Sequence, residues 1–464
     1  PLPADVGVLM LTTTASDRVP VLIATGNSDA AVSKAVQFLV QSRDQEIGTG
    51  HVILVSELAE VEPPAPRNWE DYLPASNSFK LSDLKDETDQ PFEDVTVWGS
   101  HSPALDIHFR ALPDDRFLPG NTITLRYSYG PQVNPLTSLI DVAIDGVALG
   151  GRRLSSVEGD RQKSITMTIP EDRIKPNSRL QIGFRLDPRE RRSCSRVTDQ
   201  QLWGTIHADT SFDLKRETAV QLPDLKLLQF GYPFAAPQDL STTTIALPAT
   251  PSKTDLALML AVSERLGRLS KADSVMLETY RVNQLPEENR ASEHLIAIGT
   301  QGKFPFPEVL TAGDFALGSA SSRRQQTSQI QALPDGEGVV KEVRSPWSAE
   351  QVVLALSAQT DSGLAQVQNL FNQDSLFFQL QQDTALISAN TVNPSPYETD
   401  DYTLEFLQQS TPQMVAIDPT FTGQLLGLFR GKWYVLIPGV VVSSLFIYGV
   451  AQVYLKRLDK FRNS

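Results

Sequence analysis

The feature that most constrains this chain is an uncharged run near its C-terminus. Residues 433–455, WYVLIPGVVVSSLFIYGVAQVYL, contain no charged side chain. In a helix this run spans about 35 Å, enough to cross a hydrocarbon core of ~30 Å. Trp433 and Tyr434 at one end and Tyr454 at the other suit the two membrane interfaces. The run predicts a single transmembrane helix; the alternative, a buried core helix, is disfavoured by its length.

The charges on either side of the run predict its orientation. Residues 456–464 carry four Lys and Arg side chains and Asp459, a net charge of +3. Because the whole chain has a net charge of −14, residues 1–455 carry −17. Cationic segments stay mainly on the cytoplasmic side. We therefore expect a single-pass membrane protein with residues 456–464 in the cytoplasm and the acidic bulk outside. In a bacterium this means an inner-membrane protein with its large part in the periplasm. Arg430 and Lys432 on the other flank reduce this bias.

Residues 418–431, just before the span, have the pattern of a short amphipathic helix. Phe421, Leu425 and Leu428 recur at helical spacing, and Phe429 lies beside them. Such a helix is expected to lie in the interface plane, against lipid or a membrane partner. Two glycines lower its helix propensity, so a linker turn is the alternative.

Composition excludes several classes of protein. A length of 464 residues suggests two to four domains. Cys194 is the single cysteine, so neither an intrachain disulfide nor a Cys-based zinc site is available. The acidic balance disfavours nucleic acid as a partner. With large cores, a periplasmic protein needs no disulfide.

The N-terminal residues alternate apolar runs with a helical pattern. Val6–Leu11, Val21–Thr25 and Val52–Val55 read as strands, and Ser28 is a helix cap before Ala31. Residues 1–56 are therefore expected to be parallel α/β structure, the end of a domain whose first half is missing. Residues 57–78, rich in Glu and Pro, are expected to be a linker.

Residues 79–222 change to short alternating runs between Pro, Gly and Asp turns, which predicts an antiparallel sandwich or jelly roll. Residues 223–415 return to α/β. There, Ser252 and Asp255 predict a capping box. The helix that follows is expected to bury Leu256, Met259, Leu260 and Leu266 and to end before Gly267.

The chain also contains an internal similarity. Residues 21–29, VLIATGNSD, resemble residues 353–361, VLALSAQTD. Continued without a gap, the same alignment places Leu54 and Ser56 on Leu386 and Ser388. We interpret this as a duplicated module of a sandwich followed by an α/β domain, although α/β units can look alike by chance.

Candidate glycan contacts lie in the predicted sandwich. Trp98 falls on the polar side of its strand, where an exposed ring can stack on a glucose ring; an edge Trp covered by a loop is the alternative. Asp106, His108 and Arg110 also face outward and suit sugar hydroxyls, although a solvated strand face explains them as well. Tyr127 and Tyr129 are expected to be core residues, and Trp203 is expected to be a packing residue and not a platform for a sugar ring.

Nothing in the sequence selects a catalytic, metal or cofactor site. Five histidines without close His or Glu spacing disfavour a metal. Thr25–Asp29 and Thr311–Gly318 lack the glycine patterns of phosphate loops, so no nucleotide or flavin is expected. No G-x-S-x-G motif appears.

Several motifs, in order, resemble the C-terminal part of the BcsB family of bacterial cellulose synthase subunits. The most specific stretch is residues 231–248, GYPFAAPQDLSTTTIALP, followed by residues 293–299, EHLIAIG. Residues 66–69, PRNW, residues 202–206, LWGTI, and residues 345–347, SPW, also fit. The resemblance covers the chain from residue 1 to the uncharged run.

This resemblance implies a fold and a role. The fold is a jelly-roll, carbohydrate-binding-like domain between flavodoxin-like α/β domains, then an amphipathic helix and one transmembrane helix. The role is a non-catalytic subunit of a cellulose (β-1,4-glucan) synthase. Such a subunit supports the membrane glucosyltransferase and guides the nascent glucan through the periplasm. The resemblance also implies that cyclic di-GMP activates synthesis by acting on the glucosyltransferase partner. Whether the subunit associates with copies of itself stays open.

Two other functions remain open at this point. One is a free-standing, membrane-tethered glycan-binding protein of the periplasm. The other is a periplasmic enzyme that modifies polysaccharides.

Overall fold

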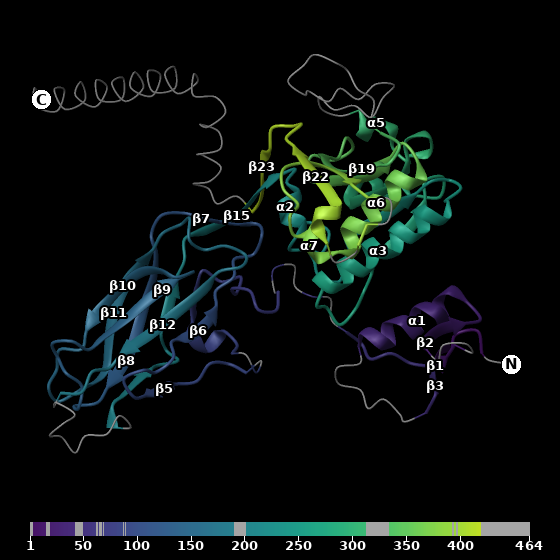
Figure 1. Cartoon of the computed structure of the whole chain (residues 1–464). Coiled ribbons are helices and arrows are strands. Elements are labelled where there is room, and N and C mark those ends of the chain that lie inside the picture. The colour runs from purple at the N-terminus through teal and green to yellow at the C-terminus, as the bar shows by residue number, and fades with distance from the viewer. Residues whose placement is uncertain are drawn as a thin grey trace, which may run out of the picture.

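The computed structural model describes residues 3–14, 19–41, 50–61, 64, 67, 69–86, 88, 90–189, 201–311, 334–391, 394–395 and 398–418. Within these ranges, no helix is both long enough and apolar enough to span a bilayer. The segments expected to form the amphipathic helix (beyond Asp418) and the transmembrane helix lie outside the described residues. Three folded bodies are seen in Figure 1: a β-sandwich at lower left, an α/β domain at upper right and a small N-terminal unit at lower right.

The N-terminal unit is a three-stranded sheet with one helix. Its elements are β1 (Gly7–Thr13), β2 (Pro20–Gly26), α1 (Asp29–Val40) and β3 (Val52–Val55). The strand order is β2-β1-β3, and β1 is antiparallel to both neighbours. The expectation of purely parallel structure is therefore wrong. The β2-α1-β3 crossover does make two strands that run the same way, but β1 lies between them.

The central body is a β-sandwich. Its elements are β4 (Ser78–Lys80), the 3₁₀ helix η2 (Leu81–Asp83), β5 (Val95–Trp98), β6 (Leu105–His108), β7 (Asp115–Phe117), β8 (Asn121–Tyr129), β9 (Leu139–Ile144), β10 (Val147–Arg153), β11 (Asp160–Ile169), β12 (Arg179–Arg185), β13 (Trp203–Ile206) and β14 (Ser211–Asp213). One sheet has the order β10-β9-β12-β6. The other has the order β4-β14-β8-β13-β5, with β11 paired to β8.

The sandwich core follows from the alternation of its strands. In β8, Ile123, Leu125, Tyr127 and Tyr129 all point inward and are at most 2% exposed, so the two tyrosines are core residues as expected. The hairpin of β9 and β10 turns at Asp145 and Gly146, both with positive φ. Two successive positive φ angles match the twist of a tight hairpin, and an Asp-Gly pair adopts them readily.

The last body is a mixed sheet flanked by helices. Its elements are α2 (Leu225–Leu228), β16 (Thr243–Leu247), α3 (Lys253–Leu269), β17 (Glu278–Arg281), α4 (Glu287–Ser292), β18 (His294–Thr300), η4 (Gln301–Lys303), α5 (Pro307–Leu310), β19 (Glu337–Arg344), β20 (Val352–Ala358), α6 (Asp361–Asn372), α7 (Asp374–Phe377), β21 (Thr384–Ala389), η5 (Thr399–Asp401) and β22 (Tyr402–Leu407). The strand order is β17-β16-β18-β20-β19-β21-β22. The first four of these strands are parallel, and β19 is antiparallel to both of its neighbours.

Helix α3 begins as expected and ends later. Ser252 and Asp255 form the capping box, but the helix continues past Gly267 to Leu269. The buried side also differs, because Leu256 and Leu260 are exposed whereas Leu258, Val262 and Arg265 are buried. Arg265 is buried because its guanidinium donates to the Phe371 carbonyl near the end of α6 and lies 4.5 Å from the Phe377 ring centroid.

The structure reproduces the internal repeat. The alignment of Val21 with Val353 places β2 exactly on β20 and α1 exactly on α6, with the same first and last positions. β19 lies between β20 and β21 as β1 lies between β2 and β3. Gly7 and Gly338 occupy equivalent places, where a helix crosses the middle strand. A Cβ at Gly7 would lie 2.5 Å from the Ala31 carbonyl oxygen, and one at Gly338 would lie 2.6 Å from that of Gly363.

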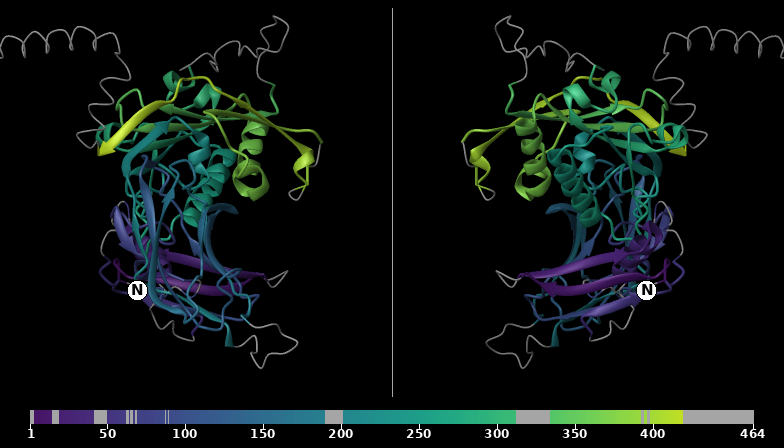
Figure 2. Two further views of the ribbon diagram at one scale, coloured as in Figure 1. Left: turned by 90° about the vertical axis from the view of Figure 1, so that its left-hand side faces the viewer. Right: turned by 90° about the vertical axis from the view of Figure 1, so that its right-hand side faces the viewer.

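A small sheet joins segments that are far apart in the sequence. β15 (Arg216–Leu222) leads from the sandwich into the α/β domain and lies between β7 and β23 (Gln413–Asp418). Both neighbours are antiparallel to β15. In Figure 1 these strands run across the junction between the two large bodies, and the side views of Figure 2 show the α/β domain above the sandwich and the N-terminal unit.

Candidate functional site

The structure separates the residues that the sequence grouped as glycan contacts. Trp98 ends β5 on the six-stranded sheet, and its side chain is exposed. Asp106 and His108 lie on β6, the edge strand of the other sheet, and Arg110 follows it. As expected, Ile107 points inward between them. The four residues therefore belong to two places on the sandwich.

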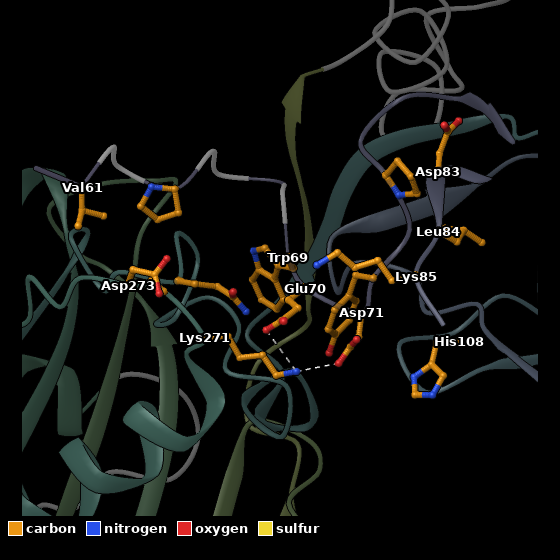
Figure 3. Close-up of a pocket in the computed structure, with 15 residues that line it drawn as sticks. Val61, Trp69, Glu70, Asp71, Asp83, Leu84, Lys85, His108, Lys271 and Asp273 are labelled. Atoms are coloured by element: carbon orange, nitrogen blue, oxygen red, sulfur yellow. Dashed lines mark hydrogen bonds and ion pairs between the residues drawn. The ribbon is translucent and has the colours of Figure 1, made fainter. Parts of the chain in front are cut away.

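The β6 residues themselves divide further. Asp106 is exposed and accepts a hydrogen bond from the Gln181 side chain at 3.0 Å. His108 lines a cavity of about 460 Å³ between the sandwich, the linker and the α/β domain. Figure 3 shows His108 on the sandwich side of this cavity, with Lys271 and Asp273 of the α/β domain opposite. The linker contributes Trp69 and Tyr72, whose rings meet edge to face at 5.3 Å.

An ion pair bridges this cavity. The Lys271 ammonium lies 2.7 Å from an Asp71 carboxylate oxygen and 3.7 Å from one of Glu70. The hydrogen bond from Lys271 lowers the pKa of Asp71, so the bridge stays charged at neutral pH. The pair holds the linker against the α/β domain, and we interpret the cavity as a domain junction.

A buried ion cluster fixes the same junction on the sandwich side. Arg67 of the linker contacts Asp114 and Asp115, each at 2.5 Å. Arg216 reaches the other oxygen of Asp115 at 2.9 Å and donates to the carbonyl groups of Pro74 and Ser76. Because both arginines are bonded to carboxylates or carbonyls, the buried charges are compensated.

The outer face of the six-stranded sheet carries a regular array around Trp98. Neighbouring residues on or just beyond β5, β13 and β8 form three rungs across the strands. The array consists of Trp98, Trp203 and Gly130 in the first rung, Thr96, Thr205 and Ser128 in the second, and Asp94, His207 and Arg126 in the third. From Trp98 to Asp94 the strip is about 13 Å long at the rise of a strand.

The first rung is aromatic. Trp98 is 58% exposed, and its ring centroid lies 6.5 Å from that of Trp203 on the neighbouring strand. A Cβ on Gly130 would lie 2.5 Å from Nε1 of Trp203, so the indole lies over the Gly130 backbone. Trp203 lies on the outer face and is half-buried, and it packs against the Gly130 backbone. In the sequence, Gly130 is the one sign of this arrangement, because the indole needs a residue without a side chain beneath it.

A chain of hydrogen bonds links the third rung to Ser128 of the second. Asp94 Oδ2 lies 2.7 Å from His207 Nδ1, and His207 Nε2 lies 2.6 Å from Ser128 Oγ. The backbone N–H groups of Ala208 and Gln162 donate to Asp94 and Ser128. The bond from Ala208 and the His207 contact lower the pKa of Asp94, which therefore stays ionised.

The hydrogen bonds join Asp, His and Ser in the same order as in the catalytic triad of a serine hydrolase. The carboxylate is the exposed group here, however, and the serine is the buried one. The Asp94 side chain is 57% exposed, whereas Ser128 is 6% exposed. A nucleophile has to reach the substrate, and its carboxylate partner is ordinarily the covered group. The arrangement therefore presents a carboxylate, and not a hydroxyl, to the outside. Sequence reasoning missed it because the three residues lie on or beside three separate strands.

The residues expected at the membrane and partner interface lie outside the described residues. These are Phe421, Leu425, Leu428, Phe429, Trp433, Tyr434 and Tyr454. Within the described residues, no group of three or more His, Cys, Asp and Glu side chains is placed to hold a metal.

The structure defines a protein of two large domains, a β-sandwich with an aromatic strip on one outer face and an adjoining α/β domain. Two family models match these bodies in order. The cellulose synthase BcsB second CBM domain matches residues 78–211, and the BcsB second FD domain matches residues 218–374. The chain belongs to the BcsB family.

Curated relatives are similar to this chain at low identity. A cyclic di-GMP-binding protein of Pseudomonas fluorescens (strain SBW25) is 24% identical over 305 residues, 61% of this chain and 39% of the relative. The protein of the same name in Komagataeibacter xylinus is 23% identical over 367 residues, 71% of this chain and 43% of the relative. The chain thus spans about two fifths of the length of these relatives.

Solved structures overlap only locally. One match is to the structure of the carbohydrate-binding module CBM36 in complex with calcium and xylotriose. It covers 30% of this chain and 98% of the module, with 9% sequence identity and a TM-score of 0.16. This overlap is too small to argue from.

Proposed function

We propose that this chain is the C-terminal part of a membrane-anchored subunit of a cellulose synthase, without catalytic activity of its own. The observation that carries the proposal is the match of two consecutive BcsB domain models to the two consecutive folded bodies. Its partner is the membrane glucosyltransferase that polymerises the glucan, and its role is to support that enzyme and to guide the nascent chain outward.

The anchor belongs to the same proposal. Residues 433–455 span the inner membrane, with the large domains in the periplasm and residues 456–464 in the cytoplasm. Residues 418–431 lie at the interface against lipid and the glucosyltransferase. The hydropathy and charge asymmetry of the sequence support this arrangement.

A non-catalytic role for the α/β domain is supported by the place in its sheet where the order of the strands reverses. We assign the domain to the flavodoxin-like class because its parallel strands run in the order 2-1-3-4, with β19 inserted before the fifth. Ligands of such sheets bind where the strand order reverses, here beyond β16 and β18. Pro248 and Phe304 crowd against Gly299 at this place, and Phe304 is buried in the core.

The name of the curated relatives suggests a link to cyclic di-GMP. We propose that this chain works in a pathway regulated by that nucleotide and that the nucleotide acts on the glucosyltransferase partner. The acidic charge of the chain, −14, supports placing the dianionic ligand elsewhere.

Glucan synthesis in membranes tests the proposal. The full-length protein is co-expressed with a glucosyltransferase, and incorporation of labelled glucose from UDP-glucose into polymer is measured. Deleting residues 419–464 should abolish polymer formation. A second variant replaces residues 433–455 by an unrelated spanning helix of equal length, which separates simple tethering from packing on the partner. Undiminished synthesis after the deletion would contradict the proposal.

A further inference from the structure

The outer face of the six-stranded sheet has an aromatic end and an ionic end. Trp98 and Trp203 form the first, and Asp94 with Arg126 belongs to the second. The rung between them consists of Thr96, Thr205 and Ser128, whose side chains are small. Thr96 and Thr205 bond each other at 2.9 Å, so they stay close to the sheet. Thr205 and Ser128 are buried whereas Thr96 is exposed, so the accessible part of the strip runs along the β5 side of the sheet, from Trp98 over Thr96 to Asp94.

The aromatic end suits the face of a pyranose ring. An indole presents a flat, electron-rich surface, and the axial C–H bonds of a β-linked glucose carry partial positive charge. Trp203 lies over the Gly130 backbone, the two indole planes are inclined at 48°, and Trp98 is the more open of the two. A ring fixed in place before binding loses little conformational entropy when a ligand stacks on it.

The ionic end suits hydroxyl groups. An ionised carboxylate has about four acceptor positions, and Asp94 uses two of them for Ala208 and His207. Its side chain is 57% exposed, so the others can accept from a ligand. Arg126 lies in the same rung, 47% exposed, and pairs with Asp209 at 3.2 Å. Both nitrogens of His207 are bonded within the chain, so this histidine positions Asp94 and does not itself contact the ligand.

We infer that this strip binds an extended β-1,4-glucan segment of more than one ring, with one ring on Trp98 and Trp203 and hydroxyls of a later ring on Asp94. Trp98 and Trp203 are stacking residues, Asp94 is a hydroxyl acceptor, and Gly130 and His207 are positioning residues. The inference rests on the proposed function for the identity of the glucan. Asp106 and His108 lie on the edge strand of the other sheet, Arg110 lies just beyond that strand, and none of the three takes part.

Calorimetric titration of the full chain in detergent with cellohexaose tests the inference, with maltohexaose as the comparison sugar. Cellohexaose should bind more tightly, because its chain is extended whereas the α-linked chain curves. Trp98→Ala and Trp203→Ala should each lower the affinity about three- to tenfold. Asp94→Asn should lower it severalfold, since an amide offers fewer acceptor positions.

Two further variants separate binding from packing. Gly130→Val keeps both indoles but pushes Trp203 off the sheet, so the affinity should fall while the circular dichroism spectrum of the folded chain is retained. Phe378→Ala removes an aromatic side chain that is 50% exposed on the α/β domain, and it should bind cellohexaose as the unchanged protein does.

The outcomes distinguish this inference from the proposed function. Absence of cellohexaose binding, or equal binding by the Trp98→Ala and Trp203→Ala variants, overturns the glucan strip even if the deletion of residues 419–464 abolishes synthesis. Loss of binding in these variants supports the strip even if polymer synthesis does not depend on residues 419–464.

Discussion

The N-terminal unit and the β19–β21 part of the α/β domain share one backbone plan but are buried to different degrees. In both, a middle strand lies antiparallel between two strands that a helix connects. Leu22 of β2 is 53% exposed, whereas Leu354, its equivalent in β20, is fully buried. Leu354 belongs to a core that includes side chains of both α3 and α6, whereas α1 is the one helix described in the N-terminal unit. β20 also pairs with β18 on its far side, within a larger sheet. The local pattern therefore specifies the crossover, while the neighbouring helices and strands determine how much its burial stabilises it.

The largest expected effect comes from the glycine that both units share. In Gly338→Val, the added Cβ would lie 2.5 Å from Cγ2 of Val367 and 2.6 Å from the Gly363 carbonyl oxygen. Because the helix cannot move out of the core, we expect the α/β domain to lose more than about 4 kcal/mol or to fail to fold. Thermal unfolding measures this.

Gly7→Val is the matched variant for that experiment. Its Cβ would meet the Ala31 carbonyl oxygen at 2.5 Å, an equally close contact. We expect loss of amide protection in β1 and α1 only, measured by hydrogen exchange. Equal loss of protection in the α/β domain would contradict the view that the two units are stabilised separately.

Truncation of the equivalent leucines sharpens the comparison. Leu354→Ala should cost about 2–5 kcal/mol because it leaves a cavity in the sheet core. Leu22→Ala, at the half-exposed equivalent position, should change the free energy of unfolding by less than about 0.5 kcal/mol. Urea unfolding of both variants measures the difference, and similar costs would show that burial is not what separates the units.

A buried carboxyl makes the stability of the α/β domain depend on pH. The N-terminal unit has no ionisable group at the equivalent position. Glu342 of β19 is 1% exposed, whereas the equivalent residue of β1 is Leu11. Burial, with Asp224 and Asp383 nearby, raises the pKa of Glu342 from 4.5 to about 8. The folded state therefore holds the proton more tightly than the unfolded state, so the stability from this group is complete below about pH 4.5 and is lost as the pH rises to about 8.

Replacing the carboxyl by the residue of the first unit tests this dependence. Glu342→Leu should remove the decline in the free energy of unfolding between about pH 5 and pH 8, because no proton is then linked to folding at this position. Glu342→Gln, which keeps the size, serves as the control and should also flatten the curve. An unchanged slope in both variants would assign the dependence to other groups.

The most local effect concerns the contact between the N-terminal unit and the α/β domain. The Gln37 side chain of α1 donates to the Val275 carbonyl and accepts from the Val275 N–H at 3.1 Å. Gln37→Ala should cost about 1–2 kcal/mol of this docking. Faster hydrogen exchange at Val275, with the core of the α/β domain unchanged, is the expected readout; Gln366→Ala on α6 is a control.

The sequence predicted the parts of the fold that local patterns encode. The repeat was visible because strand, capped helix and strand recur without a gap, and the structure places α1 and α6 at the spacing that the alignment of Val21 with Val353 requires. The middle strand was missed, because whether β1 inserts between two strands depends on pairing that no local pattern specifies. The buried side of α3 was wrong for a related reason: the charged Arg265 is buried because the end of α6 provides its partners.

The candidate site was predictable only in part. The alternation of β5 correctly placed Trp98 outside, because its neighbours Val95 and Val97 pack toward the core. Trp203, Asp94 and His207 belong to the same face only through the register of β13 with β5 and β8. That register is a tertiary property, so residues far apart along the chain could not be grouped from the sequence.

The sheet β7-β15-β23 has a mechanical consequence. β23 is the last strand before the segment that is expected to reach the membrane, and it is bonded along β15, the connection between the sandwich and the α/β domain. The hydrogen bonds between β23 and β15 therefore link Asp418 directly to the connection between the two large domains. If residues 433–455 anchor the chain as proposed, a displacement of the anchor is passed through β23 and β15 to both domains together.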